Sequence, residues 1–182
     1  FVTAKLKAGG AVITGKLSTH EFAIGGPAFD LPFPPARNPW NLEHHPGGSS
    51  SGAGASVAAG LVPAALGSDT GGSVRNPASC CGIVGIKPTY GRVSRMGVVP
   101  LSFSLDNVGP LTRTVEDNAL VLAAIAGHDP KDPASDRRPV DDYIGGLRNG
   151  VKGLKIGLIR HFYNDDLIAD PEMAASVEAT AE

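Results

Sequence analysis

The sequence predicts an α/β sandwich. Short apolar runs rich in β-branched residues alternate with longer segments that show helical spacing. Glycine and proline cluster between residues 25 and 110 and separate these runs, as turn residues do. With 182 residues, 42% of them hydrophobic, the chain is long enough to bury a core.

The helices are predicted from their start and stop signals. Residues 1–10 form the last turns of a helix that Gly9 and Gly10 end, and residues 49–62 open a helix of small side chains. The clearest helix lies within 112–130, where Thr112 or Thr114 caps the start and Gly127 ends the helix. A final helix begins at the Asp-Pro-Glu of residues 170–172.

The strands are predicted from short apolar runs bounded by turn residues. Those runs are residues 11–15, 63–69, 82–89, 92–101 and 153–160. Residues 25–46 are too rich in proline for a regular element, and an ordered loop of that length usually belongs to a site or a lid. Residues 131–150 form a polar connector, and the sequence contains no internal repeat.

Composition excludes several classes of function. A net charge of −2 gives no electrostatic footprint for nucleic acid or an anionic membrane. The only cysteines, Cys80 and Cys81, are adjacent, which excludes a disulfide framework and suggests a reducing, cytoplasmic setting. No run reaches the length of a membrane span and no signal peptide is visible. The five histidines show no metal-ligand spacing, so we expect no metal or cofactor.

Two Gly-Gly-Ser turns are the candidate site. They place Ser49 and Ser73 24 residues apart, with a predicted helix and strand between them, so both turns can reach one edge of a sheet. Paired glycines let the backbone turn sharply and direct successive N–H groups at an anion. A serine hydroxyl beside such a turn could attack the group that carries the developing charge, provided that a base accepts its proton.

Three other interpretations of these serines remain. A phosphate-binding loop would need a lysine that neither turn carries. The pattern Gly-x-Ser-x-Gly at residues 48–52 would make Ser50 the nucleophile, although it lacks the strand that should precede it. Both turns could also be ordinary polar turns at helix starts.

The stretch PGGSSSGAGASVAAGLVPAALGSDTGGSVRNPASCCGIVGIKPTYGRVSR, residues 46–95, resembles the core motif of the amidase signature family. The flanks GAVITGKLSTHEFAIG, RNPW, SLDNVGPLTRTVEDNALVLAAIAGHDPKD and GLKIGLIR are similar to that family as well. The resemblance implies an amidase-signature-type mixed β-sheet flanked by helices on both faces. It also implies that residues 1–182 are the central part of a single amidase domain, truncated at both ends.

The resemblance assigns roles to named residues. Ser73 matches the nucleophile of a Ser–Ser–Lys triad, and Ser49 matches the bridging serine after a cis peptide at Gly48. The matched oxyanion hole consists of the backbone N–H groups of Thr70, Gly71, Gly72 and Ser73, and Asp69 and Arg75 support the turn. Cys81 matches a position that packs behind it. The triad lysine of the family matches a position upstream of residue 1, so Lys16 is not expected to be the base.

These features imply an amidohydrolase that cleaves the C–N bond of a small-molecule carboxamide through an acyl-enzyme on Ser73. The alternative is the A subunit of a glutamyl- or aspartyl-tRNA amidotransferase, which frees ammonia from glutamine and works with partner subunits and tRNA. Such subunits usually carry a Ser/Asn-rich segment where residues 23–36 read AIGGPAFDLPFPPA, which favours a free-standing amidase. A third possibility, a non-catalytic binding module, does not explain both intact serines.

Overall fold

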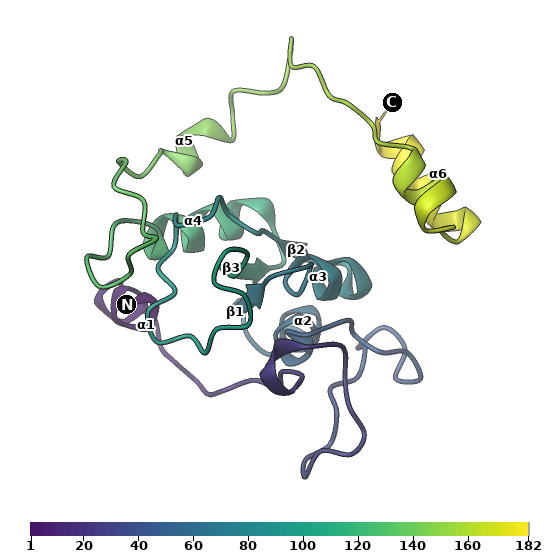
Figure 1. The fold of residues 1–182 in the computed structure, drawn as a ribbon, viewed down its shortest axis with the longest axis horizontal. Coiled ribbons are helices and arrows are strands. Elements are labelled where there is room, and N and C mark those ends of the chain that lie inside the picture. Colours follow the sequence, from purple (N-terminus) through teal and green to yellow (C-terminus); the bar gives the residue numbers. More distant parts are fainter. Residues whose placement is uncertain (182) are drawn as a thin grey trace. The chain divides into compact units, whose positions relative to one another are not determined.

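The computed structural model describes residues 1–181 and divides the chain into two compact units, Phe1–Arg148 and Asn149–Glu182 (Figure 1). The helices of the first unit are α1 (Val2–Ala8), η1 (Glu21–Ala23), α2 (Ser51–Ala58), α3 (Arg75–Cys81), α4 (Val115–Ile125) and α5 (Tyr143–Gly146). Its strands are β1 (Ala64–Asp69), β2 (Val84–Gly85) and β3 (Asn107–Thr112). The described part of the second unit contains η2 (Phe162–Asp166) and α6 (Pro171–Ala181).

The sheet of the first unit has the strand order β1-β3-β2, with both pairs antiparallel. The register joins Ala64 to Thr112 at one end of β1 and Asp69 to Asn107 at the other. The central strand β3 has all six residues buried, which requires cover on both faces of the sheet.

Helices supply that cover from both faces, because neighbouring strand residues point to opposite sides. Ala65 and its register partner Leu111 pack with α2 and α3, whereas Leu66 and Val108 pack with α1 and α4. The first core consists of Ala53, Val57, Ala65, Val74, Ala78 and Leu111, and the second of Val2, Val93, Val108, Leu122, Ile125 and Ala126. The predicted α/β class with helices on both sheet faces is therefore confirmed.

The predicted helices are also confirmed. Gly9 follows the last residue of α1, and Thr114 caps α4 by accepting a hydrogen bond from the Asp117 N–H at 3.1 Å. No helix among residues 1–181 combines the length and the apolarity that crossing a membrane requires.

Three predicted strands are wrong. Residues 11–15, 92–101 and 153–160 form no strand, and Val12 is 84% exposed. A strand needs a partner for its backbone groups, and the described residues provide none for these segments. Conversely, β3 was not predicted because Gly109 and Pro110 lie inside it, and the sequence pattern therefore resembles a turn.

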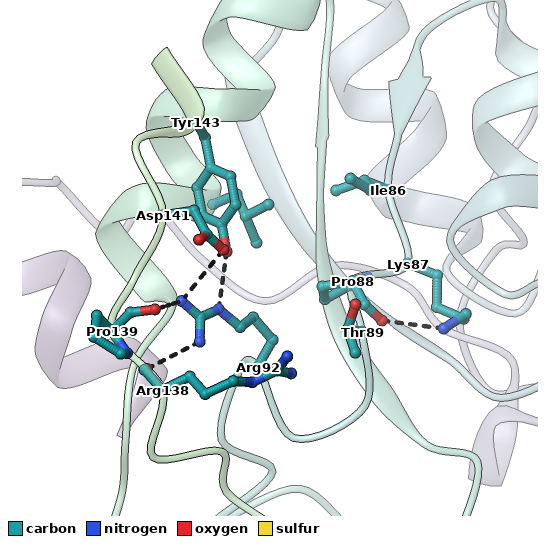
Figure 2. A pocket seen from close by; sticks show the side chains of 10 residues that line it. Ile86, Lys87, Pro88, Thr89, Arg92, Arg138, Pro139, Asp141 and Tyr143 are labelled. Atoms are coloured by element: carbon teal, nitrogen blue, oxygen red, sulfur yellow. Dashed lines mark hydrogen bonds and ion pairs between the residues drawn. The ribbon is translucent and has the colours of Figure 1, made fainter. Parts of the chain in front are cut away.

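A buried arginine holds the polar connector on the first unit. Arg92 lies in the wall of a pocket of about 310 Å³ (Figure 2). Its guanidinium donates to the Tyr143 hydroxyl at 2.9 Å and to the carbonyls of Arg138 and Pro139, and it pairs with Asp141 at 3.7 Å. Because the polar groups around Arg92 are hydrogen-bonded or paired with one another, we assign this pocket a structural role and not a reaction site.

Candidate functional site

The Ser73 turn connects the end of β1 to the start of α3. Gly72 adopts φ +132°, a conformation that side-chain-bearing residues rarely reach, and Ser73 follows it half-buried. The sharp turn therefore depends on glycine at this position.

The Asp69 carboxylate holds the turn from inside. Asp69 is fully buried, and its two oxygens accept the N–H groups of Gly72 at 2.8 Å, Val74 at 3.1 Å and Arg75 at 3.3 Å. The Arg75 guanidinium adds Nε at 3.0 Å and Nη2 at 2.9 Å. Burial alone raises the pKa of Asp69, but the guanidinium and the three N–H donors outweigh it and hold that pKa below its ordinary value.

The Ser49 turn lies directly beside the Ser73 turn. The peptide bond between Gly48 and Ser49 is cis, as the family resemblance implies, and Ser49 is fully buried. The Ser50 N–H donates to the Ser73 carbonyl oxygen at 3.2 Å, so backbone atoms of the two turns are in contact. A Cβ at Gly48 would collide with the Gly25 carbonyl oxygen, which explains why this position is glycine.

The hydroxyls of Ser49 and Ser50 differ in their partners. Ser50 Oγ lies 3.3 Å from both the N and the O of Ser68, so it is committed to the backbone of β1. Ser49 Oγ is buried and has no hydrogen-bond partner within the described residues. A buried hydroxyl left unpaired costs about 1–3 kcal/mol, so this oxygen points to a missing donor or acceptor.

An open pocket of about 570 Å³ lies in front of Ser73. Its lining consists of Ala23, Ile24, Gly25, Gly48, Thr70, Gly71, Gly72, Ser73, Asn76 and Leu101. The N–H groups of Thr70, Gly71 and Ser73 have no hydrogen-bond partner in the described part of the chain. The Gly72 N–H differs from the expectation for an oxyanion hole, because it already donates to Asp69.

Two residues that support the pocket were not singled out from the sequence. Asp106 accepts the Thr70 hydroxyl at 2.5 Å and the N–H groups of Leu101 and Ser102, so it joins the Ser73 turn to the loop that carries Leu101. Asn76 accepts the Gly48 N–H at 3.0 Å and joins α3 to the Ser49 turn. Both act between segments far apart in the chain, which local patterns do not reveal.

The proline-rich loop of residues 25–46 is held at the C-terminal end of α3. Asn38 Nδ2 donates to the Cys80 carbonyl at 2.8 Å, and Trp40 Nε1 donates to the Cys81 carbonyl at 2.7 Å. The buried Cys81 thiol lies 3.4 Å from the Pro46 carbonyl oxygen, as its expected packing role requires. These contacts satisfy carbonyl groups that a helix end otherwise leaves unpaired.

Residues 1–181 contain no cluster of three or more metal-ligating side chains. Lys16 lies exposed on an irregular segment, which does not suit a buried base. His45 Nδ1 accepts the Gly47 N–H at 2.9 Å, so this ring nitrogen carries no proton.

Comparison with known proteins gives consistent matches. The family model described as Amidase matches residues 1–182. A curated relative, the A subunit of the glutamyl-tRNA(Gln) amidotransferase of Anaeromyxobacter dehalogenans, is 57% identical over 95% of this chain and 35% of its own length. The chain therefore spans about a third of the length of that relative.

Two solved structures are similar to this chain. The A subunit of the Thermotoga maritima glutamyl-tRNA(Gln) amidotransferase is 52% identical with a TM-score of 0.80, over 84% of this chain and 33% of that one. A 6-aminohexanoate cyclic dimer hydrolase is 38% identical with a TM-score of 0.90, over 99% of this chain and 38% of that one.

Proposed function

Since the chain belongs to the amidase family, we propose that it carries the nucleophile of an amidohydrolase that cleaves carboxamide C–N bonds. In this proposal Ser73 Oγ attacks the amide carbonyl and Ser49 passes its proton onward. The observation that carries the proposal is the contact between the two turns, Ser50 N to Ser73 O, beside a pocket faced by unpaired backbone N–H groups.

The reaction proceeds through an acyl-enzyme. As Ser73 Oγ forms its bond to the carbonyl carbon, the carbonyl oxygen of the substrate becomes an anion. The N–H groups of Thr70, Gly71 and Ser73 stabilise this anion. One such donor is typically worth about 3–4 kcal/mol in the transition state. The C–N bond then breaks, the leaving nitrogen takes up the relayed proton, and water releases the acyl group from Ser73.

Ser49 needs a base behind it. Its buried oxygen has no partner within the described residues, and this supports a proton acceptor supplied by another part of the protein. In the amidase signature family the acceptor is a lysine, and we assign it to a segment outside this chain. Residues 1–182 would then be the central part of the amidase domain.

A second candidate is the ammonia-releasing subunit of a tRNA-dependent amidotransferase. The 57% identity to the Anaeromyxobacter protein favours it. The free-standing amidase is favoured by residues 23–36, which depart from the Ser/Asn-rich segment usual in those subunits. The structural match to the cyclic dimer hydrolase over 99% of the chain supports the same choice. Adjacent free cysteines support a cytoplasmic setting for either protein.

Labelling with a fluorophosphonate tests the nucleophile. The full-length protein should be labelled and S73A should not. S79A should be labelled like the wild type, because Ser79 is an exposed serine on α3, the helix that follows the Ser73 turn. Ser49→Ala should slow amide hydrolysis about 10²–10⁴-fold through loss of proton transfer. Labelling that persists in S73A would refute the proposal. Ammonia release from glutamine only in the presence of partner subunits would favour the amidotransferase.

A further inference from the structure

We propose that Asn76 determines specificity by donating a hydrogen bond to a neutral carbonyl oxygen of the substrate, separate from the amide that is cleaved. This inference rests on the proposed function, because it concerns the substrate that Ser73 attacks. It starts from one contact, the 3.0 Å hydrogen bond from the Gly48 N–H to Asn76 Oδ1.

That contact fixes the orientation of the Asn76 amide. A backbone N–H is only a donor, so the atom that faces Gly48 must be the side-chain oxygen. The NH2 group is then directed away from Gly48, and it makes no hydrogen bond within the described residues. The backbone is fixed too, since the Asn76 N–H donates to the Gly72 carbonyl at 2.6 Å. Asn76 therefore presents two N–H donors with a defined direction.

Asn76 lies where two pockets meet. It lines the 570 Å³ pocket in front of Ser73 and also a neighbouring pocket of about 370 Å³. The neighbouring pocket is lined by Gly25, Gly26, Pro27, Phe29, His45, Gly48 and Asn76. A substrate bound at Ser73 and long enough to enter the second pocket passes Asn76.

The charge of these pockets selects a neutral acceptor. The lining of the Ser73 pocket includes no ionisable side chain among the residues that the structure describes. In the neighbouring pocket the one titratable side chain is His45, whose Nδ1 accepts a hydrogen bond and is therefore unprotonated. Arg37 lies against the Phe29 ring, 5.2 Å from its centroid, but it is not itself a lining residue. A substrate carboxylate beside Asn76 would therefore meet no cation from the lining residues, whereas a carbonyl oxygen needs only the donor that Asn76 offers. The favoured substrates are thus amides with a second, uncharged carbonyl group.

The test compares diamides with alkyl amides of matched length on the full-length protein. Succinamide and glutaramide carry the second carbonyl, butyramide and valeramide lack it, and succinamate carries a carboxylate instead. We expect wild-type kcat/KM to be higher for at least one diamide than for its alkyl match and for succinamate. Asn76→Asp keeps an acceptor for the Gly48 N–H and removes the donor. It should lower the diamide preference about five- to tenfold, the usual worth of one hydrogen bond. That loss should appear as a fall in the ratio of diamide to butyramide kcat/KM, mainly through a higher KM for the diamide.

Asn76→Ala removes both the donor and the contact to Gly48, so it should lose the preference and also slow butyramide turnover. Equal losses on diamide and alkyl amide in N76D, or a wild type without any diamide preference, would overturn the inference. S73A separates this from the proposed function. If S73A is inactive while N76D keeps the wild-type diamide preference, only the role of Asn76 is refuted, whereas an active S73A refutes the nucleophile itself.

Discussion

Replacing Asp69 with asparagine should lower both the free energy of unfolding and the kcat of amide hydrolysis. The Asp69 carboxylate is fully buried and receives five hydrogen bonds, three from backbone N–H groups and two from Arg75. Asparagine has one acceptor oxygen and places an NH2 group where the second carboxylate oxygen stood. That NH2 group faces donors, so some of them lose their partner.

The magnitude follows from which donors are lost. If the amide keeps its oxygen toward the buried Val74 N–H, the Gly72 N–H and Arg75 Nη2 lose their acceptor. An unpaired backbone N–H costs about 1–3 kcal/mol. The ion pair adds about 0–1 kcal/mol because the Arg75 side chain is 52% exposed. The free energy of unfolding should therefore fall by about 1–4 kcal/mol.

The rate should fall because the turn that carries Ser73 relaxes. A displacement of about 1 Å in a reacting group costs about a hundredfold, so kcat should drop by about that factor. Urea unfolding of the full-length protein measures the first effect, and steady-state amide hydrolysis measures the second. Asp30→Asn is the matched control, because Asp30 is exposed and makes no hydrogen bond within the described residues.

The pH dependence has a defined sign. The folded pKa of Asp69 lies below the ordinary 3.8, so its contribution to stability is present above about pH 4 and is lost as the pH falls through the folded pKa. The stability difference between wild type and D69N should shrink in that acidic range. A D69N protein that matches wild type in urea midpoint and kcat would refute this account of the turn.

Three further outcomes are expected. The pKa of Glu178 is lowered to about 2 by hydrogen bonds from Arg160 and then Tyr163, so an NMR titration should find it there, and Arg160→Gln should raise it. Burial, with the adjacent thiol, raises the pKa of Cys81 to about 11, so iodoacetamide at pH 8 should alkylate it far more slowly in the folded than in the unfolded protein. Arg92→Met removes the hydrogen bonds that hold residues 138–143, so it should increase tryptic cleavage after Arg137 and Arg148. Tyr143→Phe removes one acceptor of Arg92 and should have a smaller effect.

The sequence was a good guide where local chemistry decides the structure. The cap at Thr114 and the glycines after α1 were predicted correctly, because these signals act over a few residues. The strands were harder, since an apolar run becomes a strand only when a partner pairs with it. Val12 and its neighbours have the right composition but no partner among the described residues.

For the site, the Gly-Gly-Ser pattern predicted that the two turns lie at the same edge of the sheet, and their backbones are in contact. The positions of Asn76 and Asp106 as supports were not predicted, because they contact segments 28 and 36 residues away along the chain. The pairing of Gly72 with Asp69 was missed for a related reason. A carboxylate three residues before a glycine does not reveal whether its oxygen or the pocket receives that N–H.

The contacts of the proline-rich loop connect it, through α3, to the turn that carries Ser73. The helix starts just after Ser73, and the carbonyl groups at its C-terminal end accept hydrogen bonds from Asn38 and Trp40 of the loop. The same loop contributes lining residues to the pocket beside Asn76. A change in that loop that alters the shape of this pocket should also shift α3, the helix that follows Ser73. Substitutions in this loop are therefore expected to change substrate selectivity and reaction rate together.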